Sequence, residues 1–177
     1  MKRFLLPIGF FAILIPLFVV GLGKDPRALP STFLGKPAPA FSLPQLRDAT
    51  QLVNNQSFSG TMVLINFWAT WCVGCRQEHD FLLQLQANNI IPIYGINWRD
   101  DRTKAIDWLQ QLGDPYVASG FDGGNHTGID WGVYAAPETF LVDASGTVIY
   151  KFLGPLSSYT WQKEFVPRIN AANEAAL

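Results

Sequence analysis

The chain contains one nearly unbroken apolar, β-branched run, Met62–Trp68, and its only two cysteines, Cys72 and Cys75, follow it almost at once. Such a run is typical of a strand that is buried on both faces of a sheet. The residues after the cysteines, Arg76–Gln86, have the pattern of a helix. A buried strand that leads directly into a helix indicates an α/β sheet, so this segment strongly limits the possible folds.

The rest of the chain extends this alternation of strands and helices. An amphipathic helix is stopped by Gly113 and Pro115, a hairpin turns at Asp143–Gly146, and Pro167 interrupts the last helix. The order predicts an α/β fold with a central mixed sheet flanked by helices. The further elements expected are strands at Phe41–Leu46, Gln56–Phe58, Ile90–Ile96, Thr139–Val142 and Thr147–Phe152, and helices at Arg102–Leu112 and Ser157–Ala172.

Residues 1–23 have the pattern of an N-terminal transmembrane helix. From Phe4 to Gly23 there is no charged side chain, and 20 helical residues span about 30 Å, the thickness of the hydrocarbon core. A cleaved signal peptide is the alternative, although its apolar region is usually shorter. Lys2 and Arg3 place the N-terminus on the cytoplasmic side. We therefore expect a single-pass protein of the cytoplasmic (inner) membrane whose domain lies in the periplasm.

Residues 24–39 are rich in proline and show no sustained periodicity, which indicates a linker. The remaining residues, 40–177, suffice for one domain. The formal net charge is −1, and the basic residues are scattered. Because there is no basic excess to neutralise phosphates, we expect no nucleic-acid partner.

The spacing of Cys72 and Cys75 indicates redox chemistry. A structural disulfide across so short a loop would stabilise the fold little. Two cysteines three residues apart in the first turn of a helix are close enough to form a reversible disulfide. The helix N-terminus stabilises a thiolate on Cys72, which is the attacking species in disulfide exchange. Cys75 then resolves the mixed disulfide.

Cysteines at this spacing also occur in zinc sites and in covalent haem sites. A zinc site could combine them with His79 and His126, which would make the chain a metal-binding or metallochaperone module. Covalent haem attachment is excluded, because Arg76 stands where that motif needs histidine.

Several residues near the cysteines are candidate site residues. Glu78 lies on the same helical face as Cys75, where it could accept the proton of the resolving thiol or serve the helix dipole. Pro137 marks the start of a strand, and Glu138 is by default a solvated charge. Trp71 would form part of an exposed docking surface. Four polar residues after the second strand are further candidates, namely Asn97, Arg99, Asp100 and Asp101.

These motifs resemble the DsbE/CcmG family, the thioredoxins of cytochrome c biogenesis. The active-site segment Trp68–His79 is similar, and the segment Gly132–Phe140 is the most specific match. The similarity continues through Gly35–Phe41, Tyr94–Asp101 and Phe121–Gly123. The resemblance thus extends over essentially the whole chain.

The resemblance implies a thioredoxin-like fold in which Pro137 is a cis-proline that faces the cysteines. The backbone of Ala136 would pair with the client, beside Trp71 and Tyr134. Glu78 and Glu138 would be the acidic residues of the site. No metal or separate cofactor is implied beyond the redox-active disulfide.

Family members are periplasmic reductants. They take electrons from a membrane thiol transporter of the DsbD/CcdA kind and reduce apocytochrome c or a maturation protein that holds it. A carboxylate near Cys72 would oppose its ionisation and favour electron donation. Val73 and Gly74 differ from the residues that the family commonly has between its cysteines, and Ala135 replaces a usual glycine. A general periplasmic reductase or oxidant of other clients is the alternative.

Overall fold

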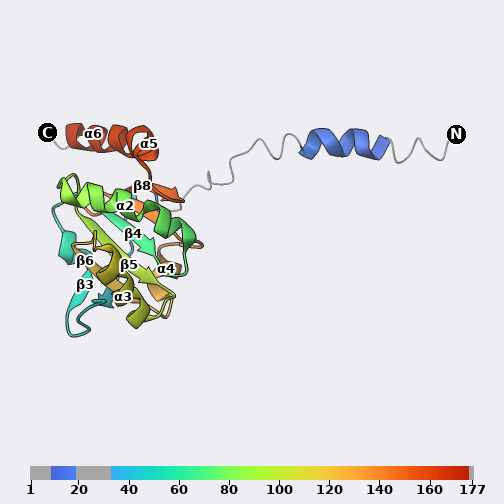
Figure 1. Ribbon diagram of the computed structural model, residues 1–177. Coiled ribbons are helices and arrows are strands. Elements are labelled where there is room, and N and C mark those ends of the chain that lie inside the picture. Colours follow the sequence, from blue (N-terminus) through green and yellow to red (C-terminus); the bar gives the residue numbers. More distant parts are fainter. Residues whose placement is uncertain (1–8, 19–32, 176–177) are drawn as a thin grey trace. The chain divides into compact units, whose positions relative to one another are not determined.

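The computed structural model describes residues 9–18 and 33–175, and the chain divides into two units, Met1–Pro30 and Ser31–Leu177 (Figure 1). In the first unit, residues 9–18 form a helix. The other residues of the predicted anchor, 1–8 and 19–23, lie outside the described part. No helix within the described ranges is both long and apolar enough to cross a membrane.

The second unit is built on a six-stranded mixed sheet with the strand order β1-β8-β7-β4-β5-β6. β4, β5 and β6 run parallel, whereas β7, β8 and β1 join by antiparallel pairing. The predicted α/β architecture is therefore confirmed. The sheet strands are β1 Lys36–Pro37, β4 Val63–Trp68, β5 Ile93–Trp98, β6 Ala118–Asp122, β7 Glu138–Val142 and β8 Thr147–Leu153, and a separate hairpin pairs β2 Ser42–Pro44 with β3 Leu52–Asn54.

Helices cover the sheet, with α2 and α3 labelled beside β4 and β5 in Figure 1. One core contains Leu82 and Leu85 of α2 together with Leu109 of α3. The core on the other face contains Phe58 and Trp131. The helical elements are η1 Asn55–Phe58, α2 Val73–Ala87, α3 Arg102–Leu112, α4 His126–Asp130, α5 Ser158–Thr160, η2 Trp161–Phe165 and α6 Val166–Ala175.

β4 lies inside the sheet, and all six of its residues are buried. Because side chains alternate along a strand, Leu64 and Trp68 join the core under α2, whereas Ile65 and Phe67 join the opposite core. The strand thus stabilises both cores at once. Its carboxyl end leads directly into the cysteine segment.

The last helix continues through Pro167 rather than ending there. Proline lacks the N–H that an α-helix would donate to the carbonyl group four residues earlier. The π-helical segment η2 lies directly before α6, and Pro167 is the second residue of α6. The guanidinium group of Arg168 donates a hydrogen bond to the carbonyl oxygen of Glu164, in the π-helical segment before the proline.

Some expected elements are wrong or incomplete. Residues Gln56–Phe58 are not a strand but part of the 3₁₀ helix η1, because the side chain of Asn54 caps its N-terminus. β1 lies within the predicted linker and pairs with β8. β6 and α4 were not predicted. The sequence of β6, Ala-Ser-Gly-Phe-Asp, has little strand propensity, and its pairing with β5 determines its conformation.

Candidate active site at the start of helix α2

The two cysteines lie between β4 and α2 and are joined by a disulfide, as predicted. Cys72 is the N-cap residue of α2, Cys75 lies in its first turn, and their Cα atoms are 5.3 Å apart. The backbone N–H of Cys75 donates to Sγ of Cys72 at 3.0 Å. After reduction, the partial positive charge of the helix N-terminus would stabilise a thiolate on Cys72. The geometry therefore favours Cys72 as the attacking thiol.

Glu78 follows Cys75 by one helical turn and is completely buried. Its oxygens accept hydrogen bonds from neutral donors, Oε1 from the Asn66 amide at 2.9 Å and Oε2 from the Leu156 N–H at 2.8 Å. Burial raises the pKa of Glu78 to about 8, and the two hydrogen bonds oppose this only in part. A carboxyl group with this pKa exchanges protons near neutral pH, which suits an acceptor for the thiol proton.

A buried polar network that the sequence analysis missed holds Glu78 in place. The amide of Asn66 also donates to Thr139 Oγ1 at 3.0 Å, and its oxygen accepts a hydrogen bond from the Tyr116 hydroxyl at 2.9 Å. Because Tyr116 occupies the amide oxygen, the amide nitrogen is directed toward Glu78. The sequence did contain a signal, since Asn66 is the only strongly polar residue in the apolar run of β4.

Pro137 packs against the segment between the two cysteines. The Ala136–Pro137 peptide bond is cis, which agrees with the family resemblance. A Cβ atom on Gly74 would lie only 2.8 Å from Cδ of Pro137 and 3.8 Å from Cδ of Pro155. Gly74 therefore has a steric role, because its missing side chain leaves room for the proline ring.

Glu138 does not lie beside Glu78. It pairs in register with Phe67, which belongs to the core on the opposite face of the sheet. The interpretation of Glu138 as a solvated charge is wrong, because the residue is completely buried. Its Oε1 accepts the N–H groups of Tyr134 and Ala135 at 3.1 and 3.2 Å, so it holds the loop before Pro137. Of the two glutamates, only Glu78, a residue of α2, lies on the same face of the sheet as the cysteine helix.

Exposed apolar side chains occur on both segments that form the site. Trp71 and Val73 flank Cys72 in the chain and are 54% and 74% exposed, and Tyr134, in the loop before Pro137, is 52% exposed. Trp68, by contrast, is a core residue that stacks on Tyr116. Exposed aromatic and aliphatic groups of this kind are suited to docking a polypeptide.

Three of the four polar candidates at the end of β5 and just after it support the cysteine segment. The carboxylate of Asp100 accepts the backbone N–H of Thr70 at 2.6 Å and its hydroxyl at 2.7 Å, and also the Asn97 amide. The carbonyl oxygen of Arg99 accepts a hydrogen bond from Trp71 Nε1 at 3.0 Å. Asp101 caps α3. These contacts fix the turn that presents the disulfide.

The histidines do not form a Cys2His2 set with the cysteines. His79 packs edge-on against Trp108, and its Nε2 lies 3.2 Å from the carbonyl oxygen of Gly113. His126 is the first residue of α4. Within residues 9–18 and 33–175, no group of three or more His, Cys, Asp or Glu side chains is arranged to hold a metal ion.

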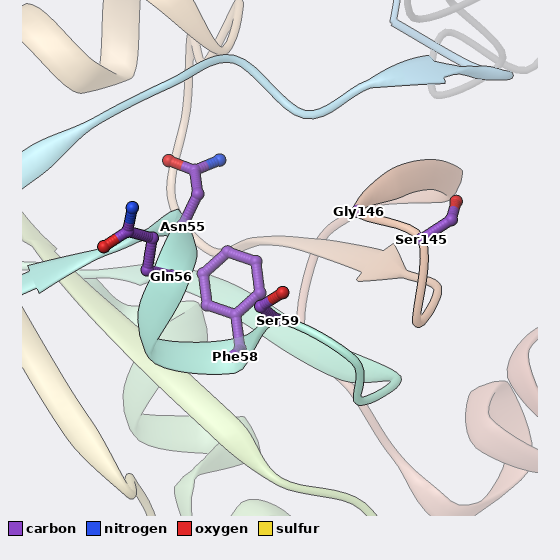
Figure 2. Close-up of a pocket in the computed structure, with 6 residues that line it drawn as sticks. All are labelled: Asn55, Gln56, Phe58, Ser59, Ser145 and Gly146. Atoms are coloured by element: carbon purple, nitrogen blue, oxygen red, sulfur yellow. The ribbon is translucent and has the colours of Figure 1, made fainter.

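A hollow of about 280 Å³ lies between η1 and the turn that joins β7 to β8 (Figure 2). That turn follows Val142, which pairs with Val63 at the start of β4, whereas the cysteines follow the other end of β4. The hollow is therefore at the opposite end of the sheet from the disulfide. Its lining residues carry no ionisable side chain and are Asn55, Gln56, Phe58, Ser59, Ser145 and Gly146.

The fold and the cysteine site together define a thioredoxin-like thiol–disulfide oxidoreductase. The family model described as Redoxin matches residues 33–164. The chain is 46% identical to the thiol:disulfide interchange protein DsbE of Allochromatium vinosum, over 94% of this chain and 92% of that protein. It is 47% identical to DsbE of Escherichia coli K12, over 82% of this chain and 78% of that protein. The chain therefore belongs to the DsbE family.

A solved structure agrees with this assignment. The secreted thiol-disulfide isomerase of Corynebacterium glutamicum superposes with a TM-score of 0.67 at 25% identity. The superposition covers 83% of this chain and 96% of that chain. The oxidoreductase fold thus accounts for nearly the whole of that structure.

The contact between Gly74 and Pro137 predicts that a side chain at position 74 destabilises the protein. In Gly74→Ala, overpacking costs about 1–3 kcal/mol, whereas the better helix propensity of alanine recovers about 1 kcal/mol. We expect a net loss of about 1 kcal/mol in urea unfolding of the oxidised protein. Val73→Ala, at the exposed neighbouring position, is the control and should unfold as the wild type does. A Gly74→Ala protein as stable as the wild type would contradict the steric role.

The buried Glu78 predicts a pH-dependent stability. Its pKa is about 8 in the folded protein and ordinarily near 4.5. Between these values the folded state holds a proton that the unfolded chain has released, so the free energy of unfolding falls as pH rises. We expect Glu78 to lower the free energy of unfolding by up to about 1.4 kcal/mol for each pH unit. The Glu78→Gln variant should lose this pH dependence. Unfolding at pH 5 to 8 measures it. The exposed Glu174→Gln should retain the wild-type slope, and the same slope in Glu78→Gln would contradict the assignment.

Proposed function

We propose that this protein is a membrane-anchored periplasmic reductant of the disulfide in apocytochrome c, or in a maturation protein that holds it. The observation that carries the proposal is Glu78, a buried carboxyl group with neutral hydrogen-bond partners, one helical turn from the resolving cysteine. The cytochrome c client and the periplasmic location come from the resemblance of the Trp68–His79 and Gly132–Phe140 segments to the family.

The reaction is a transfer of two electrons by two exchanges. The Cys72 thiolate attacks one sulfur of the client disulfide, so a mixed disulfide forms and the other client sulfur leaves as a thiolate. The Cys75 thiol then gives its proton to Glu78 and attacks Sγ of Cys72. The client is released with both sulfurs reduced, and Cys72 and Cys75 are left as a disulfide. A membrane thiol donor of the DsbD/CcdA kind would reduce this disulfide again.

The geometry also supports a direction for the reaction. The ionised carboxylate of Glu78 disfavours negative charge on the nearby sulfurs, so it opposes the effect of the helix N-terminus. A less stabilised thiolate makes the reduced dithiol a better electron donor. Because Glu138 lies on the other face of the sheet and is paired with Lys151, we assign this bias to Glu78 rather than to Glu138.

Client binding would use the surface around the disulfide. The backbone of Ala136, just before the cis-proline, would pair with an extended client segment, as in other strand-addition complexes. Trp71 and Tyr134 offer exposed aromatic contacts on the two sides of the site. These contacts suit an unfolded polypeptide, because they depend little on the client's own fold.

The proposal predicts the protein that Cys75→Ser captures in cells. Without the resolving thiol, the mixed disulfide on Cys72 persists and can be isolated under non-reducing conditions. We expect mass spectrometry to identify apocytochrome c or its holder on Cys75→Ser, and nothing on the control variant Cys72→Ser. Capture of unrelated secreted proteins would instead support a general disulfide reductase or oxidant.

The proposal also predicts a reducing potential. In redox titration we expect a value nearer to that of thioredoxin, about −270 mV, than to that of DsbA, about −120 mV. Glu78→Gln removes the opposing charge, so its potential at pH 8 should be less reducing than that of the wild type. Glu174→Gln should not differ from the wild type. A wild-type potential close to that of DsbA would contradict the proposed direction.

A further inference from the structure

Lys151, on β8, reaches the loop between α4 and β7, although disulfide exchange does not itself require it. Its Nζ atom lies 2.7 Å from Oε2 of Glu138 and donates to the carbonyl oxygen of Gly132 at 2.8 Å. The same nitrogen lies 4.9 Å from the ring centroid of Tyr134 and 5.2 Å from that of Phe140. The Lys151 side chain is 10% exposed and that of Glu138 is fully buried, so water screens this ion pair little.

The Glu138–Lys151 pair fixes the loop at three backbone groups. Glu138 accepts the N–H groups of Tyr134 and Ala135, and Lys151 binds the carbonyl oxygen of Gly132. These groups lie on the chain directly before the cis-proline that packs on the cysteine segment. The ion pair therefore holds the part of the loop that the proposed function assigns to client binding.

We propose that Lys151 is a positioning residue for client binding. It neutralises Glu138 and thereby keeps the exposed ring of Tyr134 and the backbone of Ala136 in one arrangement. The ligand that this arrangement fits is an extended polypeptide segment next to its own disulfide, bound through backbone hydrogen bonds and an aromatic contact. The identity of the client in this inference rests on the proposed function. The ordering of the loop rests only on the contacts of Lys151.

The charge of Lys151 is the property that matters. Replacing it with methionine keeps an apolar stem of similar length but leaves Glu138 buried without a counter-charge, which is strongly unfavourable. The carboxylate would then move toward water and release the two N–H groups. Replacing Glu138 with glutamine in the same protein removes the uncompensated charge, and the amide oxygen can still accept those N–H groups.

The experiment compares four full-length variants, Lys151→Met, Lys151→Arg, Lys151→Met/Glu138→Gln and the control Lys163→Met. Lys163 is a suitable control because its side chain is 61% exposed. Hydrogen exchange of the Tyr134 and Ala135 amides, followed by NMR, reports the ordering of the loop. Steady-state reduction of an oxidised peptide containing Cys-x-x-Cys-His, with a small dithiol as the electron donor and its direct reaction subtracted, reports KM and kcat, and redox titration reports the potential.

We expect Lys151→Met to speed exchange of the two amides and to raise KM for the peptide about tenfold, with kcat changed less than about twofold. Its potential should match that of the wild type, because the cysteines and Glu78 are untouched. Lys151→Arg should recover most of the affinity, the double variant should exchange more slowly than Lys151→Met, and Lys163→Met should behave as the wild type.

Unchanged amide exchange in a folded Lys151→Met protein would overturn the inference, and so would an unchanged KM. A fall in kcat or a shifted potential without a change in KM would also contradict it, because positioning of the client acts on KM. If the wild type does not reduce the peptide, the proposed function fails. The amide exchange still decides whether Lys151 orders the loop.

Discussion

The structure depends on the burial of β4 on both faces of the sheet. Every side chain of this strand is buried, and five of the six lie in one of two hydrophobic cores, so its position and register are strongly determined. Its carboxyl end places Cys72 at the N-terminus of α2, where the helix stabilises a thiolate. The neighbouring strand β7 is registered against it, which brings the cis-proline to the cysteine segment. The site is thus assembled by two segments whose relative position is set by the pairing of β4 with β7.

The same strand carries Asn66, which is the main departure from an apolar interior. Burying an amide and a carboxyl group is unfavourable unless both are hydrogen-bonded. Here Asn66 and Glu78 bind each other, and Tyr116, Thr139 and the backbone complete the network. The network keeps a carboxyl group in a water-poor place, where its pKa rises to about 8. The unfavourable burial of this carboxyl group is therefore retained one helical turn from Cys75, a thiol that loses a proton in disulfide exchange.

The two glutamates that the family resemblance groups together have different surroundings. Glu78 has neutral partners and lies on the cysteine face of the sheet, whereas Glu138 has a cationic partner and lies on the other face. The first is placed to affect the sulfurs by charge and by proton transfer. The second holds the loop before Pro137 through the N–H groups of Tyr134 and Ala135. The sheet thus separates the two carboxyl groups and their partners, because alternate residues of β4 and β7 point to opposite faces.

The sequence alone determined the helices and strands that their own periodicity and composition identify. Periodicity and composition predicted β4, the cysteine helix and the β7–β8 hairpin, and the spacing of Cys75 and Glu78 placed both on the buried face of α2. Only the tertiary structure decided the partners of these residues, such as Asn66 and Tyr116 for Glu78 and Lys151 for Glu138. The periodicity of apolar residues along one helix or strand specifies which face a side chain occupies, but not which distant residue contacts it. That depends on register and packing between segments up to 78 residues apart.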